Sequence, residues 1–108
     1  IKGLNFIECL TMFEADTNTE GIIMVGEIGG SDEELAAEFI LNNIKKPVVA
    51  YIAGLTAPEG KRMGHAGAII SGNSGKAIDK INSLKKSGVW IAESPANMGQ
   101  VMAQALKK

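Results

Sequence analysis

A single histidine lies in a segment whose neighbours have unusually small side chains. His65 is the only histidine among 108 residues, and the segment reads Gly64-His65-Ala66-Gly67-Ala68. Small neighbours allow a ligand or the backbone to approach the imidazole closely. Imidazole can act as a base or a nucleophile near neutral pH. Taken alone, a single histidine of this kind is more often a residue that is hydrogen-bonded for structural reasons.

A carboxylate follows an apolar run that comes earlier in the chain. Glu27 follows the run 22–25 after a single glycine, Gly26, and the cations Lys61 and Arg62 precede the histidine. A carboxylate on one ring nitrogen would orient the imidazole and raise the basicity of the other nitrogen. The alternative is a Glu27 that bonds backbone amides in a glycine-rich turn. The two cations would either neutralise phosphate oxygens or form a solvated basic turn.

The glycines after Glu27 allow two interpretations. A turn with Gly26, Gly29 and Gly30 that opens a helix suggests a cradle of backbone amides for phosphate. The acidic residues 32–34 would occupy the first turn of that helix, and their charge would oppose a phosphate there. We therefore assign Gly29 and Gly30 to turn geometry.

The elements that must position these residues alternate along the chain. Hydrophobic periodicity and capping residues predict helices over 5–13, 31–46, 74–88 and 94–106, and strands over 21–26, 48–52 and 89–92. The strand at 22–25 is continuously apolar, which is typical of a strand covered on both faces. Residues 54–73 show no periodicity, and so long a connection inside a compact domain is usually functional or disordered.

This order predicts an α/β fold, with three parallel strands and helices on both faces of the sheet. Ligands of such sheets bind at the carboxyl ends of the strands. Glu27 and the start of the histidine segment follow neighbouring strands and should therefore share one edge. Cys9 and the methionines are expected to fill the core.

Composition excludes several classes of protein. Eleven Lys and Arg against 12 Asp and Glu give a net charge of −1, so no bulk attraction to nucleic acid is expected. No apolar run approaches the length of a membrane span. A single Cys cannot form a disulfide within the chain, and one Cys with one His cannot form a tetrahedral zinc site, so we expect no metal site. We expect the protein to lie in the cytoplasm of a bacterium.

Three motifs together resemble a known family. They are Gly-Glu-Ile-Gly-Gly at 26–30, Tyr-Ile-Ala-Gly-Leu-Thr-Ala-Pro at 51–58 and Gly-Lys-Arg-Met-Gly-His-Ala-Gly-Ala-Ile-Ile at 60–70. The combination closely resembles the α subunits of succinyl-CoA synthetases (succinate–CoA ligases), across essentially the whole chain. The resemblance implies that His65 is the histidine phosphorylated during turnover and that Glu27 holds its ring.

The resemblance also implies the reaction and its participants. Succinyl-CoA, phosphate and ADP or GDP would be interconverted with succinate, CoA and ATP or GTP through a phosphohistidine. Coenzyme A would be a substrate, and an ATP-grasp β subunit would bind the nucleotide with Mg. This chain alone would bind none of these cofactors and would be inactive. Another phosphohistidine acyl-CoA synthetase, including a citrate-cleaving relative, is the nearest alternative.

The family's architecture further implies that 1–108 is the C-terminal part of a flavodoxin-like ligase domain. The three strands would be strands 3, 4 and 5 of five, and a CoA-binding Rossmann domain would be absent. The strand at 22–25 would then be a bare edge through which we expect self-association. The family pattern predicts a glycine-rich stretch with an added Lys after the histidine segment. This chain departs from the pattern, since it has Ser71-Gly72-Asn73-Ser74-Gly75 there. A flavodoxin-like signalling receiver is a further alternative, but Glu27 and Glu93 do not supply its Asp and Lys.

Overall fold

The computed structural model describes residues 5–54 and 76–107 and has the alternating order expected from the sequence. The elements are α1 (Phe6–Ala15), β1 (Ile22–Glu27), α2 (Asp32–Asn43), β2 (Val48–Ala53), α3 (Ala77–Lys86), β3 (Trp90–Ile91), the 3₁₀ turn η1 (Pro95–Asn97) and α4 (Met98–Leu106). The predicted α/β class is confirmed. The third strand is shorter than the predicted 89–92, and α2 ends three residues before the predicted end.

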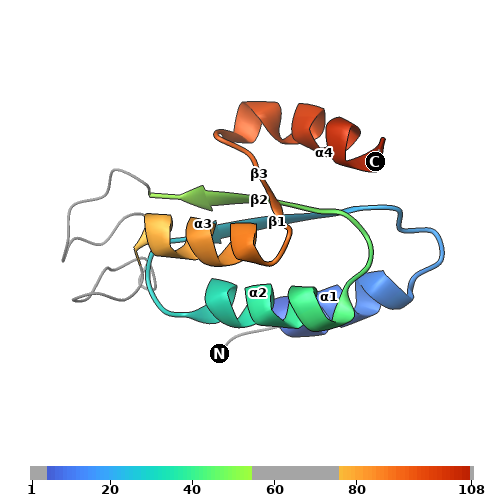
Figure 1. Ribbon diagram of the computed structural model, residues 1–108, viewed down its shortest axis with the longest axis horizontal. Helices are drawn as coiled ribbons and strands as arrows, with labels where there is room; N and C mark the ends of the chain where they lie inside the picture. The colour runs from blue at the N-terminus through green and yellow to red at the C-terminus, as the bar shows by residue number, and fades with distance from the viewer. Residues whose placement is uncertain (1–4, 55–75, 108) are drawn as a thin grey trace.

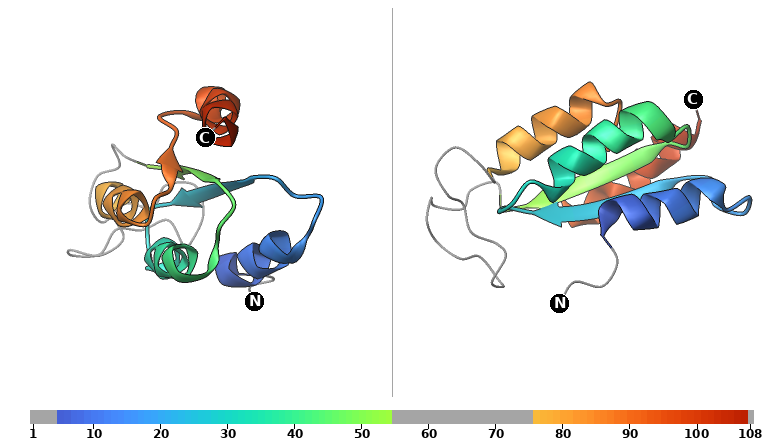
Figure 2. Two further views of the ribbon diagram at one scale, coloured as in Figure 1. Left: turned by 45° about the vertical axis from the view of Figure 1, so that its right-hand side comes forward. Right: turned by 90° about the horizontal axis from the view of Figure 1, so that it is seen from below.

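The three strands form one parallel sheet in the order β1-β2-β3. Helices α1, α2 and α3 cover one face of the sheet, and α4 covers the other (Figures 1 and 2). The register pairs Ile22 with Val48 at one end of β1 and Glu27 with Ala53 at the other. The last residues of β1 and β2 therefore lie side by side at the carboxyl edge, as predicted for parallel neighbours.

Helix boundaries follow local capping chemistry. Asn5 Oδ1 accepts the backbone N–H of Glu8 at 2.8 Å, which satisfies a free amide at the start of α1. Gly88 has φ of 84°, the left-handed conformation that commonly follows a helix, and it comes two residues after α3. Ser94 and Asn97 form a capping box ahead of α4. These three observations confirm Asn5, Gly88 and Ser94 as residues that begin or end a helix.

Two hydrophobic clusters hold the layers together. The larger one lies beneath α1, α2 and α3 and includes Leu10, Met24, Ile40 and Leu84. The smaller one joins α4 to the sheet through Val49, Ala92 and Ala105, with Trp90, Met98 and Met102 packed against it. Met24, Met98 and Met102 pack as core filling, as predicted, but Met12 is exposed. Cys9 is half-buried in an apolar groove between α1 and β1.

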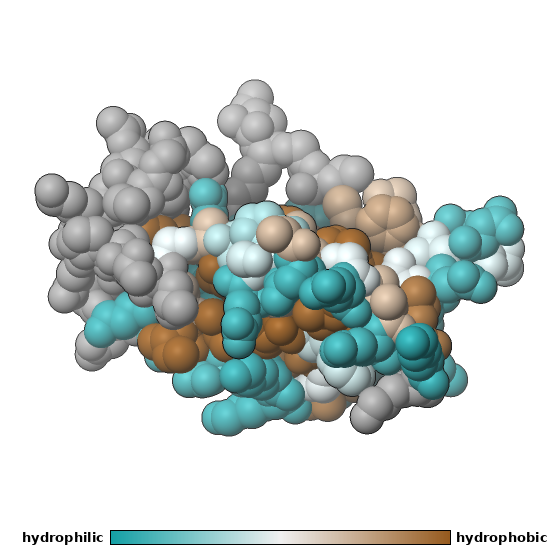
Figure 3. Space-filling view, turned by 90° about the horizontal axis from the view of Figure 1, so that it is seen from above, coloured by the Kyte–Doolittle hydropathy of each residue, from teal (hydrophilic) through white to brown (hydrophobic). Residues whose placement is uncertain are grey.

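The prediction that β1 is covered on both faces is wrong for the part of the chain that the structure describes. Ile22 and Met24 are buried, but Ile23 and Val25 are 49% and 55% exposed. The reason is the placement of α4, which packs on β2 and β3. Figure 3, seen from the α4 side, shows hydrophobic residues among the hydrophilic side chains of this face. No helix in 5–54 or 76–107 is both long and apolar enough to cross a membrane.

Candidate functional site

Glu27 lies where the sequence predicted, at the end of β1. Its register partner is Ala53, the last residue of β2, and the chain continues from there through Gly54 into 55–75. Glu27 is half-buried, and its backbone N–H donates to Glu33 Oε2 at 3.0 Å. His65, Lys61 and Arg62 lie outside the described residues. The structure thus places Glu27 beside the point at which the histidine segment leaves the sheet.

The turn after Glu27 packs directly against that exit point. Ile28 is 1% exposed, and its Cγ2 lies 2.7 Å from the position that a Cβ on Gly54 would occupy. Gly54 also has φ of 95°, which side chains disfavour. A glycine is required here for both reasons. Burial of an isoleucine side chain contributes about 1.5–3 kcal/mol, so this contact couples the turn firmly to the end of β2.

A buried lysine, which the sequence analysis missed, lies behind the same turn. Lys80 comes from α3 and is completely buried. Its ammonium donates to the carbonyl oxygens of Gly29 at 2.9 Å and Gly30 at 3.1 Å, and to Glu33 Oε1 at 2.5 Å. All three ammonium protons therefore have an acceptor, as a buried cation requires.

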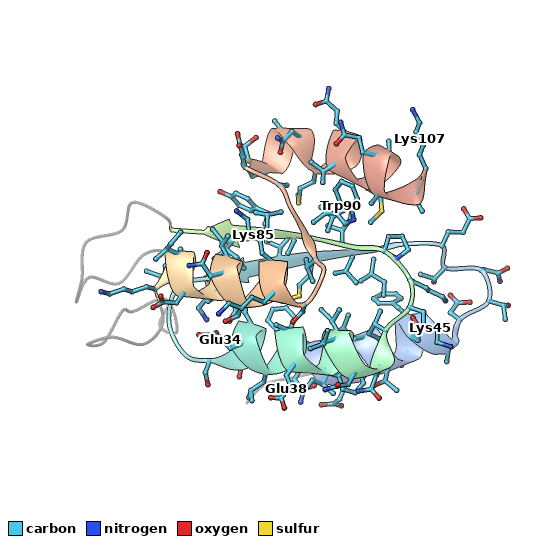
Figure 4. The ribbon with its side chains drawn as sticks, in the orientation of Figure 1. Glu34, Glu38, Lys45, Lys85, Trp90 and Lys107 are labelled. Carbon is cyan, nitrogen blue, oxygen red and sulfur yellow. The ribbon has the colours of Figure 1, made fainter. Side chains whose placement is uncertain are left out.

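Two glutamates of α2 face this ammonium. Glu33 is 4% exposed and uses both oxygens, one for Lys80 and one for the amide of Glu27. Glu34 Oε1 lies 3.5 Å from the ammonium and is buried, without a hydrogen bond of its own. Figure 4 shows Glu34 where α2 faces α3. One cation thus faces two carboxylates between the helices.

Residues 31–34, Ser-Asp-Glu-Glu, have the spacing of a capping box, but no capping box forms there. Ser31 occupies the N-cap position of α2, but its side chain makes no capping hydrogen bond. Glu34, which would complete the box, turns toward Lys80 instead. A buried ammonium attracts a carboxylate more strongly than an amide at a solvent-exposed helix end does.

The glycines of the turn serve geometry, as predicted. Gly29 and Gly30 have φ of 95° and 65°, and their carbonyl groups accept from Lys80. A Cβ on Gly26 would lie 2.5 Å from Glu33 Oε2, so Gly26 makes room for the carboxylate. The groups of the turn that face the buried ammonium of Lys80 are thus the carbonyls of Gly29 and Gly30, and not backbone amides that could hold a phosphate.

The sequence did contain a signal for the network. Lys80 has the helical spacing of Ala77 and Leu84, both buried, and Glu33 has that of the buried Ala36 and Ile40. Opposite charges on the apolar faces of two helices therefore indicated an internal ion pair. Among 5–54 and 76–107, no group of three or more His, Cys, Asp or Glu residues is placed to hold a metal ion.

A carboxyl group with a lowered pKa, that of Asp16, lies away from this edge. The backbone N–H of Asn18 and the hydroxyl of Thr19, at 3.0 and 2.7 Å, lower the pKa of Asp16. These bonds favour the ionised form. Asp16 closes the turn between α1 and β1, at the opposite end of the strand from Glu27, and belongs to the fold rather than to the site.

The amino-acid sequence is similar to those of known proteins. The family model described as CoA-ligase matches residues 2–90. Succinate–CoA ligase [ADP-forming] α subunits are similar over almost the whole chain: 52% identity over 99% of it in Aquifex aeolicus and 51% over 100% in a Staphylococcus epidermidis strain. The chain covers 35% and 36% of those two proteins, about a third of their length.

A solved structure agrees as well. The fold matches an ATP citrate lyase from Methanosaeta concilii, in complex with (3S)-citryl-CoA, with a TM-score of 0.87 and 25% identity. The match covers 96% of this chain and 18% of that one. The predicted resemblance is thereby confirmed, and the chain belongs to the CoA-ligase family.

Proposed function

We propose that this chain is the C-terminal part of the α subunit of a succinate–CoA ligase, in which His65 carries a phosphoryl group and Glu27 orients its ring. The observation that carries the proposal is the position of Glu27. It ends β1 beside Ala53, one residue before the segment that leads to His65. The chain that has this arrangement is 52% and 51% identical in sequence to two succinate–CoA ligase α subunits.

The chemistry divides one difficult exchange into simpler transfers. Phosphate attacks the thioester carbon of succinyl-CoA and releases CoA, which gives succinyl phosphate. An imidazole nitrogen of His65 then attacks phosphorus, and the bond to the succinate carboxylate oxygen breaks. The terminal oxygen of ADP or GDP finally attacks the same phosphorus and frees the histidine. A covalent relay of this kind needs a nucleophile held in one tautomer, which is the role assigned to Glu27.

The proposal includes partners outside this chain. An ATP-grasp β subunit would bind the nucleotide and its Mg, and the CoA-binding Rossmann domain would belong to the remainder of the α subunit. The chain described here would be the later part of a flavodoxin-like domain, active only in the cytoplasmic complex. At this edge Lys80 faces the carboxylates of Glu33 and Glu34, and the proposal assigns the binding of Mg to the partner.

Phosphoryl labelling tests the proposal. The complete α subunit with its β partner is incubated with nucleoside triphosphate labelled in the γ-phosphoryl group, and the labelled peptide is identified by mass spectrometry. We expect an acid-labile label on His65, released by succinate with CoA, and no label in His65→Ala. Lys86→Met, which changes an exposed residue of α3, is the control. A label on another residue, or none in the unaltered enzyme, would overturn the assignment.

The match to ATP citrate lyase supports one second candidate, a citrate-cleaving relative with the same relay. The acyl acceptor distinguishes the two. Release of the label by citrate with CoA, but not by succinate with CoA, would favour the second candidate and leave the role of His65 unchanged.

A further inference from the structure

The ammonium of Lys80 is completely buried and fully bonded. Removing such a charge from water is costly, so a lysine is retained at a buried position only where its bonds compensate. Its three closest acceptors are Gly29 O, Gly30 O and Glu33 Oε1. All three belong to the six residues that follow Glu27. Lys80 is thus hydrogen-bonded to residues 28–33, the segment that directly follows Glu27.

A continuous set of bonds joins Lys80 to Glu27. One oxygen of the Glu33 carboxylate accepts from the ammonium and the other accepts from the Glu27 N–H. Gly26 allows the close approach, since a Cβ there would lie 2.5 Å from the carboxylate oxygen. The backbone of Glu27 is therefore held on one side by β2 and on the other by a carboxylate whose position is set by Lys80.

The two carbonyl bonds restrain the rest of the turn. Gly29 and Gly30 have left-handed backbones, and glycine in solution visits many other conformations. The ammonium selects the one conformation in which both carbonyls face α3. Because Ile28 is buried against Gly54, a change in this turn would also reach the start of the histidine segment.

We propose that Lys80 is a positioning residue for phosphoryl transfer: through Glu33 and the Gly29–Gly30 carbonyls it holds Glu27 in the orientation that His65 requires. This inference rests on the proposed function, in which Glu27 orients His65. Lys80 touches no reacting atom. Its contribution is to fix the backbone that carries the orienting carboxylate.

Rapid measurement of His65 labelling in the complete enzyme tests the inference. We expect Lys80→Met to lower the rate of labelling at saturating nucleotide at least tenfold, with little change in the KM for nucleotide. The matched control, Lys86→Met, replaces an exposed lysine of the same helix and should label at the unaltered rate. Rates are normalised to the folded fraction, determined by circular dichroism.

The decisive comparison uses a double variant. If Lys80 acts through Glu27, then Lys80→Met should cost less than twofold in an enzyme that already carries Glu27→Gln, because interacting residues are not additive. A lysine that acts on labelling independently of Glu27 would instead multiply its effect onto that of Glu27→Gln. Multiplicative effects would overturn the inference, as would a normal rate in Lys80→Met.

A second variant covers the case in which Lys80→Met does not fold. Glu33→Gln has the same shape, but one of the two oxygens that now accept from Lys80 and from the Glu27 amide becomes an NH2 group, which donates and cannot accept. We expect at least a threefold slower labelling, and an unaltered rate would contradict the inference. Failure of the proposed function is a different result, namely that the unaltered enzyme carries no label on His65 or that Glu27→Gln labels normally.

Discussion

The carboxylate of Glu33 lies between the ammonium of Lys80, at 2.5 Å, and the backbone amide of Glu27, at 3.0 Å. Lys80 is 47 residues away from Glu33 in the chain, so the contact exists only after α2 and α3 have packed on the sheet. The contact forms an ion pair, and its carboxylate is hydrogen-bonded to Glu27, the residue assigned to orient His65. Stability and the position of Glu27 are therefore linked at one carboxylate.

Removal of the buried cation should destabilise the fold strongly. Lys80→Met leaves Glu33 buried without its partner, and breaking a buried pair in this way costs about 3–5 kcal/mol. Urea unfolding followed by circular dichroism measures the loss. The exposed-lysine control, Lys86→Met, should stay within about 0.5 kcal/mol. Adding Glu33→Gln to Lys80→Met should recover part of the loss, because less buried charge is left uncompensated, and no recovery would argue against this electrostatic account.

Gly26→Ala should also destabilise the fold, by about 1–3 kcal/mol. The added Cβ would lie 2.5 Å from Glu33 Oε2 and 2.8 Å from Ile52 Cδ1, so the carboxylate or the core must move. Gly99→Ala is the matched control, since nothing lies within 4 Å of its Cβ position in α4. That control should stabilise the helix by about 0.5–1 kcal/mol. Equal thermal midpoints for the two variants would contradict the packing described here.

Glu27→Gln should slow phosphorylation of His65 by about a hundredfold while changing stability little, since the side chain is half-buried. The amide keeps the shape of the carboxylate but cannot stabilise a positively charged ring. Labelling rates of the complete enzyme and unfolding curves measure the two effects separately. Glu38→Gln, on an exposed site of α2, is the control. A loss of stability that accounts for all of the lost labelling would contradict the orienting role.

We expect the chain to self-associate through β1. In the described part of the chain, β2 is the only strand paired with β1, and an apolar groove lined by Phe6, Leu10 and β1 runs beside it. Lysine on an edge strand opposes pairing with another chain. Ile23→Lys with Val25→Lys should therefore lower the mass seen by light scattering, whereas Leu41→Lys on α2 should not. A monomer at high concentration in the unaltered chain would disprove the expectation.

The Asp16 turn should make a small, pH-dependent contribution to stability. Hydrogen bonds from the Asn18 amide and the Thr19 hydroxyl lower the pKa of Asp16 in the folded state, so its contribution is present above the unfolded value and is lost as the pH falls through the folded value. Asp16→Asn should lower the thermal midpoint slightly at neutral pH and match the unaltered chain in strong acid. A difference that persists at a pH low enough to protonate Asp16 in the folded state, which lies below its ordinary value of 3.8, would point to another cause.

The sequence alone determined the order of the elements and the position of Glu27. Helices and strands have different hydrophobic periods, and caps such as Asn5 and Gly88 act over a few residues, so these features can be inferred locally. Parallel neighbours end at the same edge, which was enough to predict that Glu27 and the exit toward His65 lie together.

Tertiary structure alone decided which charges are buried and which apolar residues are not. Ile23 and Val25 belong to a continuous apolar run, yet they stay exposed because α4 packs on the other two strands. Helical spacing puts Lys80 and Glu33 on the apolar faces of their helices, but only the packing of α2 against α3 removes both from water and makes them partners. Periodicity within one element indicates which face is apolar, whereas the residues that cover this face depend on the rest of the chain.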